Sequence, residues 1–161
     1  MSDKGTELRA QRPANHAAGR EGWPVNDVLI RHRLLALDRR YLFALPSITV
    51  GRVTRDIVHE LRQIAVDYED LLKSGLSVSA HFSERAVRAK IGDALGSAAW
   101  ACEALQDPEQ ARAHFLAAVA VYTRAGATDK ARRCLTELDR LNFYGLRDVL
   151  GAPSRTRQAA R

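Results

Sequence analysis

The residues in this sequence that come nearest to a catalytic motif are His59 and Glu60. A metalloprotease helix begins with the same pair and carries a second histidine four positions after the first, where both rings reach one zinc ion. Here that position holds Gln63, so the second ligand is missing. No two histidines are spaced three or four residues apart to complete a site; the others are His16, His32, His81 and His114. We therefore expect no metal site.

The candidate nucleophiles do not form a recognisable reactive centre. Cys102 and Cys134 are the only cysteines, too few for a disulfide scaffold and in keeping with a reduced cytosol. Both fall on the inward faces of expected helices, which predicts small core residues rather than reactive thiols. The sequence contains no Gly-x-Ser-x-Gly turn and no glycine-rich phosphate loop. We predict a non-enzymatic protein without catalytic residues and without a cofactor.

The net charge of +6 and the isoelectric point near 9.8 raise the question of nucleic-acid binding. Half of the excess positive charge lies in the last sixteen residues, which contribute +3, whereas residues 25–145 contribute only +2. Phosphate recognition needs several cations that converge on one surface. Nucleic-acid binding is therefore the alternative function, through the basic tail and two arginine-bearing helix faces. These faces carry Arg31, Arg33, Arg39 and Arg40, and Lys130, Arg132 and Arg133.

An acidic group, Asp67, Glu69 and Asp70, stands at the end of the second expected helix. Carboxylates at a helix C-terminus oppose the helix dipole. They indicate either a contact with a basic partner or a solvated surface.

The chain length and its apolar pattern predict one helical domain. No apolar run reaches 18 residues and the N-terminus has no apolar stretch, so we expect neither a membrane span nor a secretory signal, and a cytoplasmic location. Residues 1–24 mix charge with Gly, Pro and Ala and are expected to be a disordered arm. Residues 25–145 are expected to form the folded domain, and residues 146–161 a short turn followed by a flexible basic tail.

Within the domain, apolar residues recur every three to four positions over five segments, as on one face of a helix. No segment alternates in the manner of a strand, so the fold class is all-α, an antiparallel bundle of about five helices. The expected core rows are Ile30, Leu34, Leu37, Tyr41 and Leu45; Val53, Ile57, Leu61, Ile64, Tyr68, Leu71 and Leu72; Val87, Ile91, Leu95, Ala98, Cys102 and Leu105; Ala111, Phe115, Ala118, Val119 and Tyr122; and Ala131, Leu135, Leu138 and Leu141.

Capping and breaking residues predict where these helices begin and end. The expected N-terminal signals are Asn26 for the first helix, Ser83 for the third, Pro108 in the first turn of the fourth and Thr128 for the fifth, and Asp107–Pro108 is expected to break the third helix. The expected C-terminal signals are Pro46, Gly75, Gly126 and the segment Asn142–Gly145, for the first, second, fourth and fifth helices respectively.

The last three expected helices resemble the tetratricopeptide repeat. The stretch Phe115-x-x-Ala118-Val119-x-x-Tyr122-x-x-x-Gly126-x-x-x-x-Ala131-x-x-x-Leu135-x-x-Leu138 has the repeat's spacing of small, aromatic and turn positions. Small residues let two antiparallel helices approach closely, and the glycine permits a tight turn between them. A second register, shifted upstream, uses Leu95, Ala98, Ala99, Cys102, Ala111, Phe115 and Ala118. The resemblance covers residues 92–141, at most one and a half repeats.

The resemblance implies a scaffold that binds peptides or helices. In the upstream register the groove-lining positions fall on Asp93, Gly96, Trp100 and Glu103. Trp100 is then either an anchor for a partner or a residue packed beneath the second helix. In the downstream register the groove positions are Ala113, Leu116, Ala120 and Thr123, which we expect to be buried or paired with another helix.

We therefore predict a protein–protein interaction adaptor, in the style of accessory subunits of bacterial multi-protein defence or signalling systems. Its partner would bind the Trp100 face, or apolar surface left uncovered at one end of the array. A short helical array needs caps, which a partner or a second copy of the chain would provide.

Overall fold

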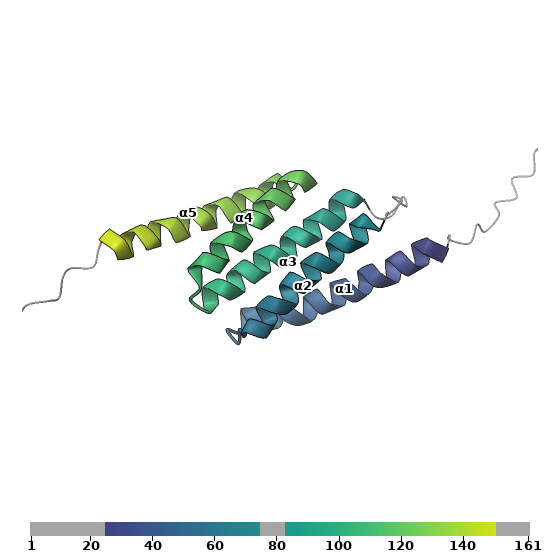
Figure 1. Ribbon diagram of the computed structural model, residues 1–161, viewed down its shortest axis with the longest axis horizontal. Coiled ribbons are helices and arrows are strands. Elements are labelled where there is room, and N and C mark those ends of the chain that lie inside the picture. The colour runs from purple at the N-terminus through teal and green to yellow at the C-terminus, as the bar shows by residue number, and fades with distance from the viewer. Residues whose placement is uncertain (1–24, 75–82, 151–161) are drawn as a thin grey trace, which may run out of the picture.

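The computed structural model describes residues 25–74 and 83–150, and they form five helices with no strand among them. In chain order the helices are α1 (Val25–Thr49), α2 (Arg55–Lys73), α3 (Glu84–Ala104), α4 (Pro108–Ala125) and α5 (Thr128–Leu150). Each helix lies beside the next, and α1 and α5 form the two outer edges (Figure 1). The all-α prediction is confirmed.

The five helices form two layers, and α3 contacts each of the other four helices. The first layer contains α1, α3 and α5: the hydroxyls of Tyr41 on α1 and Ser97 on α3 are 2.9 Å apart, and Arg140 of α5 binds Glu103 of α3. The second layer contains α2 and α4, which flank α3 on its other side and enclose a shallow pocket with it. Of the helix pairs, α3 with α4 has the most extensive contact, followed by α2 with α3.

Three of the predicted helix ends are confirmed by their local geometry. The hydroxyl of Ser83 accepts a hydrogen bond from the backbone N–H of Ala86 at 3.1 Å, as an N-cap does. Asp107 caps α4 in the same way, and Pro108 occupies the first turn. Gly126 ends α4 in the left-handed conformation at φ 65°, which glycine adopts at little steric cost.

The predicted end of α1 at Pro46 is wrong. The helix runs through Pro46 to Thr49, since proline removes only its own N–H, and the carbonyl of Pro46 still accepts from Val50 at 3.0 Å. The chain turns at Gly51, whose φ of +69° is left-handed. Asn26, predicted as the N-cap, lies inside α1.

The other end of the domain also differs from the prediction. Helix α5 passes through Asn142–Gly145 and continues to Leu150, so residues 146–150 are helical rather than a turn. A glycine inside a helix costs about 1 kcal/mol relative to alanine, which does not by itself end the helix. The basic tail at 151–161, the arm at 1–24 and Gly75 lie outside the described residues; α2 ends at Lys73, with Ser74 as its C-cap.

The buried core follows the predicted rows, except that at two positions the residue next to the predicted one is buried instead. On α1 the buried position is Ala44 rather than Leu45, and on α5 it is Cys134 rather than Leu135, which is exposed. Both changes preserve a spacing of three and four residues along the inward row. Leu105 follows the end of α3 and is also exposed.

Small residues allow α3 to be buried on several sides. Its buried positions are Val87, Ile91, Gly92, Ala94, Gly96, Ala98, Ala99, Ala101 and Cys102. Around them pack large side chains from α2 and α4, above all Leu61, Ile64, Tyr68 and Phe115, each at most 1% exposed. Both cysteines are buried and free, and burial raises the pKa of each thiol, as expected for core residues.

Candidate partner-binding surface

Two of the four residues predicted to line a groove are engaged inside the fold. The Asp93 carboxylate accepts a 2.6 Å hydrogen bond from the Tyr122 hydroxyl on α4. It also binds the Lys130 ammonium of α5, at 2.6 and 2.9 Å. Gly96 is buried, and a Cβ added to it would lie 3.8 Å from the Tyr122 hydroxyl. This part of α3 is therefore covered by α4 and α5.

The other two residues, Trp100 and Glu103, lie nearer the end of α3 and also meet α5. Both carboxylate oxygens of Glu103 bind the Arg140 guanidinium, at 2.5 and 2.6 Å. The same guanidinium lies 5.9 Å from the centre of the Trp100 ring, and the ring edge meets Phe115 at 5.5 Å between centroids. Trp100 thus packs against α4 and α5 rather than beneath α2.

The Trp100 side chain nevertheless keeps 44% of its surface exposed. Together with Ile48, Glu103 and Ala104 it lines a shallow depression between the ends of α1 and α3. Of the four predicted residues, Trp100 alone therefore presents a large apolar surface to solvent.

A second series of polar contacts fastens α1 to the bundle. Asp38 binds the Lys90 ammonium of α3 at 2.6 Å and accepts a hydrogen bond from the Tyr68 hydroxyl of α2. Arg40 binds Glu60 at 2.7 Å and Asp67 at 2.5 Å, both on α2. Burial raises the pKa of Asp67, but Gln63 and Arg40 donate to its carboxylate and the net pKa is lowered. Asp38 and Arg40 therefore lie at the two margins of the part of α1 that is attached to α2 and α3.

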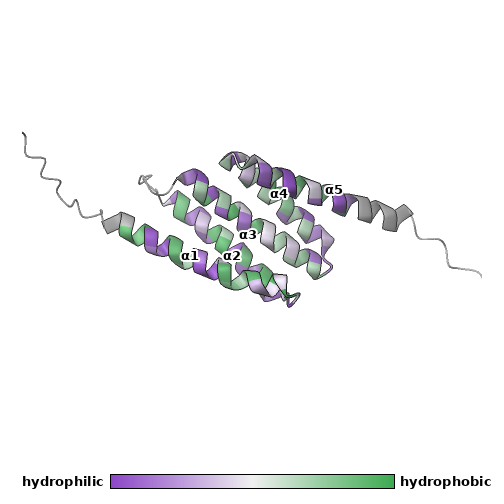
Figure 2. Ribbon diagram, turned by 180° about the vertical axis from the view of Figure 1, so that it is seen from behind, coloured by the Kyte–Doolittle hydropathy of each residue, from purple (hydrophilic) through white to green (hydrophobic). Residues whose placement is uncertain are grey.

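Between these two attached sides, α1 presents an apolar face to solvent that the sequence analysis did not identify. Its exposed fractions range from 44% at Val28 to 82% at Phe43. Figure 2 shows apolar and polar turns alternating along this edge helix. The sequence signal was present, because α1 is apolar on two sides while only one row was assigned to the core. We call this the α1 outer face; its apolar residues are Val28, Leu29, Leu35, Leu42, Phe43 and Val50.

The exposed surface of α4 also differs from the prediction. Ala113, Leu116, Ala120 and Thr123, expected to be buried or paired with a helix, are all exposed. Only Leu116 among them is a large apolar residue, so this row is a weaker docking surface than the α1 outer face.

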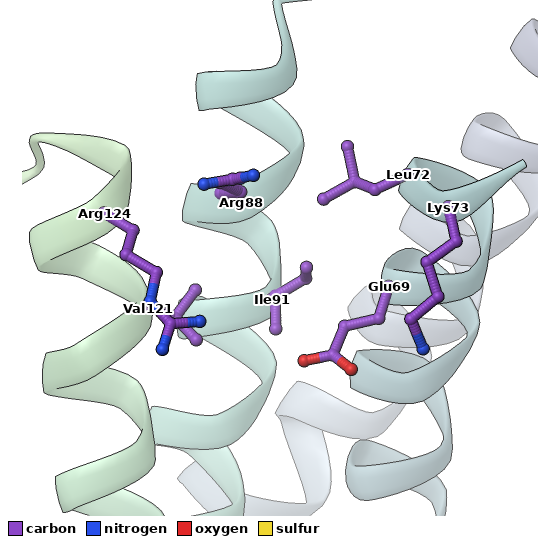
Figure 3. A pocket seen from close by; sticks show the side chains of 7 residues that line it. All are labelled: Glu69, Leu72, Lys73, Arg88, Ile91, Val121 and Arg124. Carbon is purple, nitrogen blue, oxygen red and sulfur yellow. The ribbon is translucent and has the colours of Figure 1, made fainter. Parts of the chain in front are cut away.

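A pocket of about 250 Å³ lies in the second layer, where α2 and α4 diverge above α3 (Figure 3). Its apolar floor is formed by Leu72, Ile91 and Val121, and Glu69, Lys73, Arg88 and Arg124 surround it. Arg88 is held by Glu84 and Lys73 by Asp70. Two of the four rim charges are therefore compensated by ion pairs within their own helices.

Toward the other end of α2, a second pocket is lined in part by Arg55, His59 and Arg62, and Arg62 also lies near the half-buried His114 of α4. The Nε2 atom of His114 is buried without a hydrogen-bond partner among the described residues. Burial lowers the pKa of His114, and the positive charge of Arg62 lowers it further. The folded protein therefore favours the neutral imidazole.

We expect this histidine to make the fold sensitive to mild acid. The unfolded chain binds a proton near the ordinary pKa of 6.5, whereas the folded chain binds it only at lower pH. The free energy of unfolding should therefore fall as the pH decreases below 6.5, until the folded-state pKa is passed. Urea unfolding between pH 7.5 and pH 5, followed by circular dichroism, should show a smaller pH dependence for His114→Gln. Equal pH dependence of the wild type and of His114→Gln would contradict the assignment.

The predicted basic faces are partly neutralised. Arg40 is bound by α2, Lys130 by Asp93 and Arg132 by Asp129. In residues 25–74 and 83–150 no cluster of three metal-ligating side chains occurs, and no helix combines the length and apolarity needed to cross a bilayer.

Comparison with protein-family models, curated proteins and solved structures found no match.

Proposed function

We propose that the protein is a non-catalytic cytoplasmic adaptor that binds a helix of another protein along the α1 outer face. The observation that carries this proposal is the set of six large apolar side chains exposed on an edge helix, between two sides already attached to α2 and α3. Contiguous exposed apolar surface is typical of interaction sites in folded proteins. The resemblance of residues 92–141 to the tetratricopeptide repeat supports the same class of function.

The arrangement of the apolar residues favours a helix as the occupant. Val28, Leu35 and Leu42 are seven residues apart, as are Leu29, Ala36 and Phe43. Such seven-residue spacing gives two nearly straight rows along the helix, the geometry into which another helix packs. A helix bound there would cap the open edge of the array.

The test is affinity capture from the native host with the tagged full-length chain, read by mass spectrometry. Leu42→Glu combined with Phe43→Ser should abolish capture of the specific partner. The matched control, Val66→Ser combined with Leu116→Ser, changes exposed apolar residues of the second layer and should retain it. Both double variants should melt like the wild type, because exposed substitutions change stability by only about 0.5 kcal/mol. The captured protein is then purified and its direct binding measured.

Two results would contradict the proposal. If the α1 double variant still captures the partner while Trp100→Ala loses it, the partner binds the Trp100 face instead. If the protein binds duplex DNA or RNA at about 50 mM salt and releases it as salt rises, the nucleic-acid alternative applies.

A further inference from the structure

We infer that the partner of the α1 outer face is an acidic amphipathic helix, which places a carboxylate against Arg39. The inference rests on the proposed function and names the chemistry of the occupant. It follows from the position of Arg39 within the face and from the charges around it.

Arg39 stands in the middle of the apolar face rather than at its margin. Successive helical residues are rotated by about 100°, so Arg39, four residues after Leu35 and three before Leu42, lies between the two apolar rows. His32 occupies the same middle position one heptad earlier. Both side chains are exposed. Any helix that covers the apolar rows must therefore also cover Arg39.

Nothing in the described part of the chain neutralises Arg39. Its neighbours Asp38 and Arg40 are each bound to other helices, and no ion pair involves Arg39 itself among the described residues. The outer face has no carboxylate of its own. A charge that loses its water without gaining a counter-charge is strongly unfavourable. The partner must then supply the carboxylate.

The same charges argue against two other occupants. A second copy of α1, packed parallel, would set Arg39 beside Arg39; packed antiparallel about Leu35, it would offer Arg39 no carboxylate of the outer face. A lipid surface would place the guanidinium among acyl chains, whereas membrane-surface helices keep their cations at the margins of the apolar face. A heterologous helix with an acidic residue in its apolar seam satisfies both the apolar rows and Arg39.

The probes are three synthetic amphipathic peptides of about three heptads, held helical by a staple on their solvent side. They differ only at two seam positions seven residues apart, which carry Glu, Gln or Lys. Titration of each fluorescently labelled peptide with the full-length chain gives its dissociation constant. The wild-type chain should bind the Glu peptide at least about tenfold more tightly than the Gln peptide, and the Lys peptide least.

Charge reversal supplies the decisive variant. Arg39→Glu should invert the order, so that the Lys peptide binds best, while the matched control Arg133→Glu on α5 should leave the order unchanged. The double variant Leu42→Glu with Phe43→Ser should bind none of the three.

The remaining outcomes separate this inference from the proposed function. Equal affinity for the three peptides, all lost in the double variant, would overturn the acidic partner and leave the docking face intact. Binding of the Glu peptide that survives the double variant would overturn both. Three further results would each overturn the inference. The first is that none of the three peptides binds, and the second is that the chain binds anionic phosphatidylserine vesicles but shows no preference among the peptides. The third is that sedimentation shows a dimer that Leu42→Glu dissociates. The capture experiment decides the proposed function independently.

Discussion

Replacing Gly92 with alanine is expected to lower the free energy of unfolding by about 2 kcal/mol, the cost of overpacking a filled core. A Cβ at this position would lie 2.6 Å from Cε1 and 2.7 Å from Cδ1 of the Tyr122 ring. The ring has little freedom to withdraw, because Tyr122 is buried and its hydroxyl is held by Asp93. The closest packing of α3 against α4 depends on the missing side chain.

The matched control is Gly96→Ala, four residues later on the same helix. There the added Cβ would meet only the Tyr122 hydroxyl, at an ordinary distance of 3.8 Å. Since alanine is favoured over glycine within helices by roughly 0.5–1 kcal/mol, this variant should be neutral or slightly stabilising. Urea unfolding followed by circular dichroism compares the two. Equal destabilisation by both would show that α3 and α4 do not approach as closely as described.

Removing the Asp93 carboxylate by Asp93→Ala is expected to cost about 2 kcal/mol of stability, as for other hydrogen bonds to charged groups. Its loss leaves the buried Tyr122 hydroxyl, whose pKa is raised by burial and by this hydrogen bond, without its acceptor. The Lys130 ammonium loses its partner as well, but about half of its side chain is exposed, so water compensates most of that loss. The Tyr122–Asp93 bond should dominate.

A double-mutant cycle isolates this bond. Asp93→Asn keeps an acceptor for Tyr122 and should cost clearly less than Asp93→Ala. When Tyr122 is already replaced by Phe, Asp93→Ala should lower the free energy of unfolding much less than it does in the wild type. When Lys130 is already replaced by Met, Asp93→Ala should lower it by nearly the same amount as in the wild type. If the larger coupling instead belongs to Lys130, the ion pair and not the tyrosine hydroxyl holds α3 to its neighbours.

Local signals in the sequence identified several helix ends correctly. Ser83, Asp107 and Gly126 act through hydrogen bonds and dihedral angles within a few residues of themselves, so distant parts of the chain hardly affect them. Pro46 and the segment Asn142–Gly145 were misjudged because a helix can absorb a single unfavourable residue when the residues on both sides remain helical.

The exposure of the candidate site depends on contacts between residues far apart in the sequence. The spacing of Asp93, Gly96, Trp100 and Glu103 places them on one face of α3, as the structure has them. What covers that face is decided by Lys130 and Arg140 of α5, which are 37 residues further along the chain in both ion pairs. Residue spacing within one helix carries no information about such contacts.

The sequence by itself determined the helical class, the number of helices, most positions of the inward rows and the absence of a recognisable catalytic motif, because these follow from local periodicity and residue type. Only the tertiary structure decided which apolar rows stay exposed. Helix α1 has apolar residues on two sides, and its sequence does not distinguish the buried side from the open one. Its position at the edge of the array does, because α2 and α3 cover the inward part of α1 as far as Asp38 and Arg40 and leave Leu42 and Phe43, with Arg39 beside them, in contact with water.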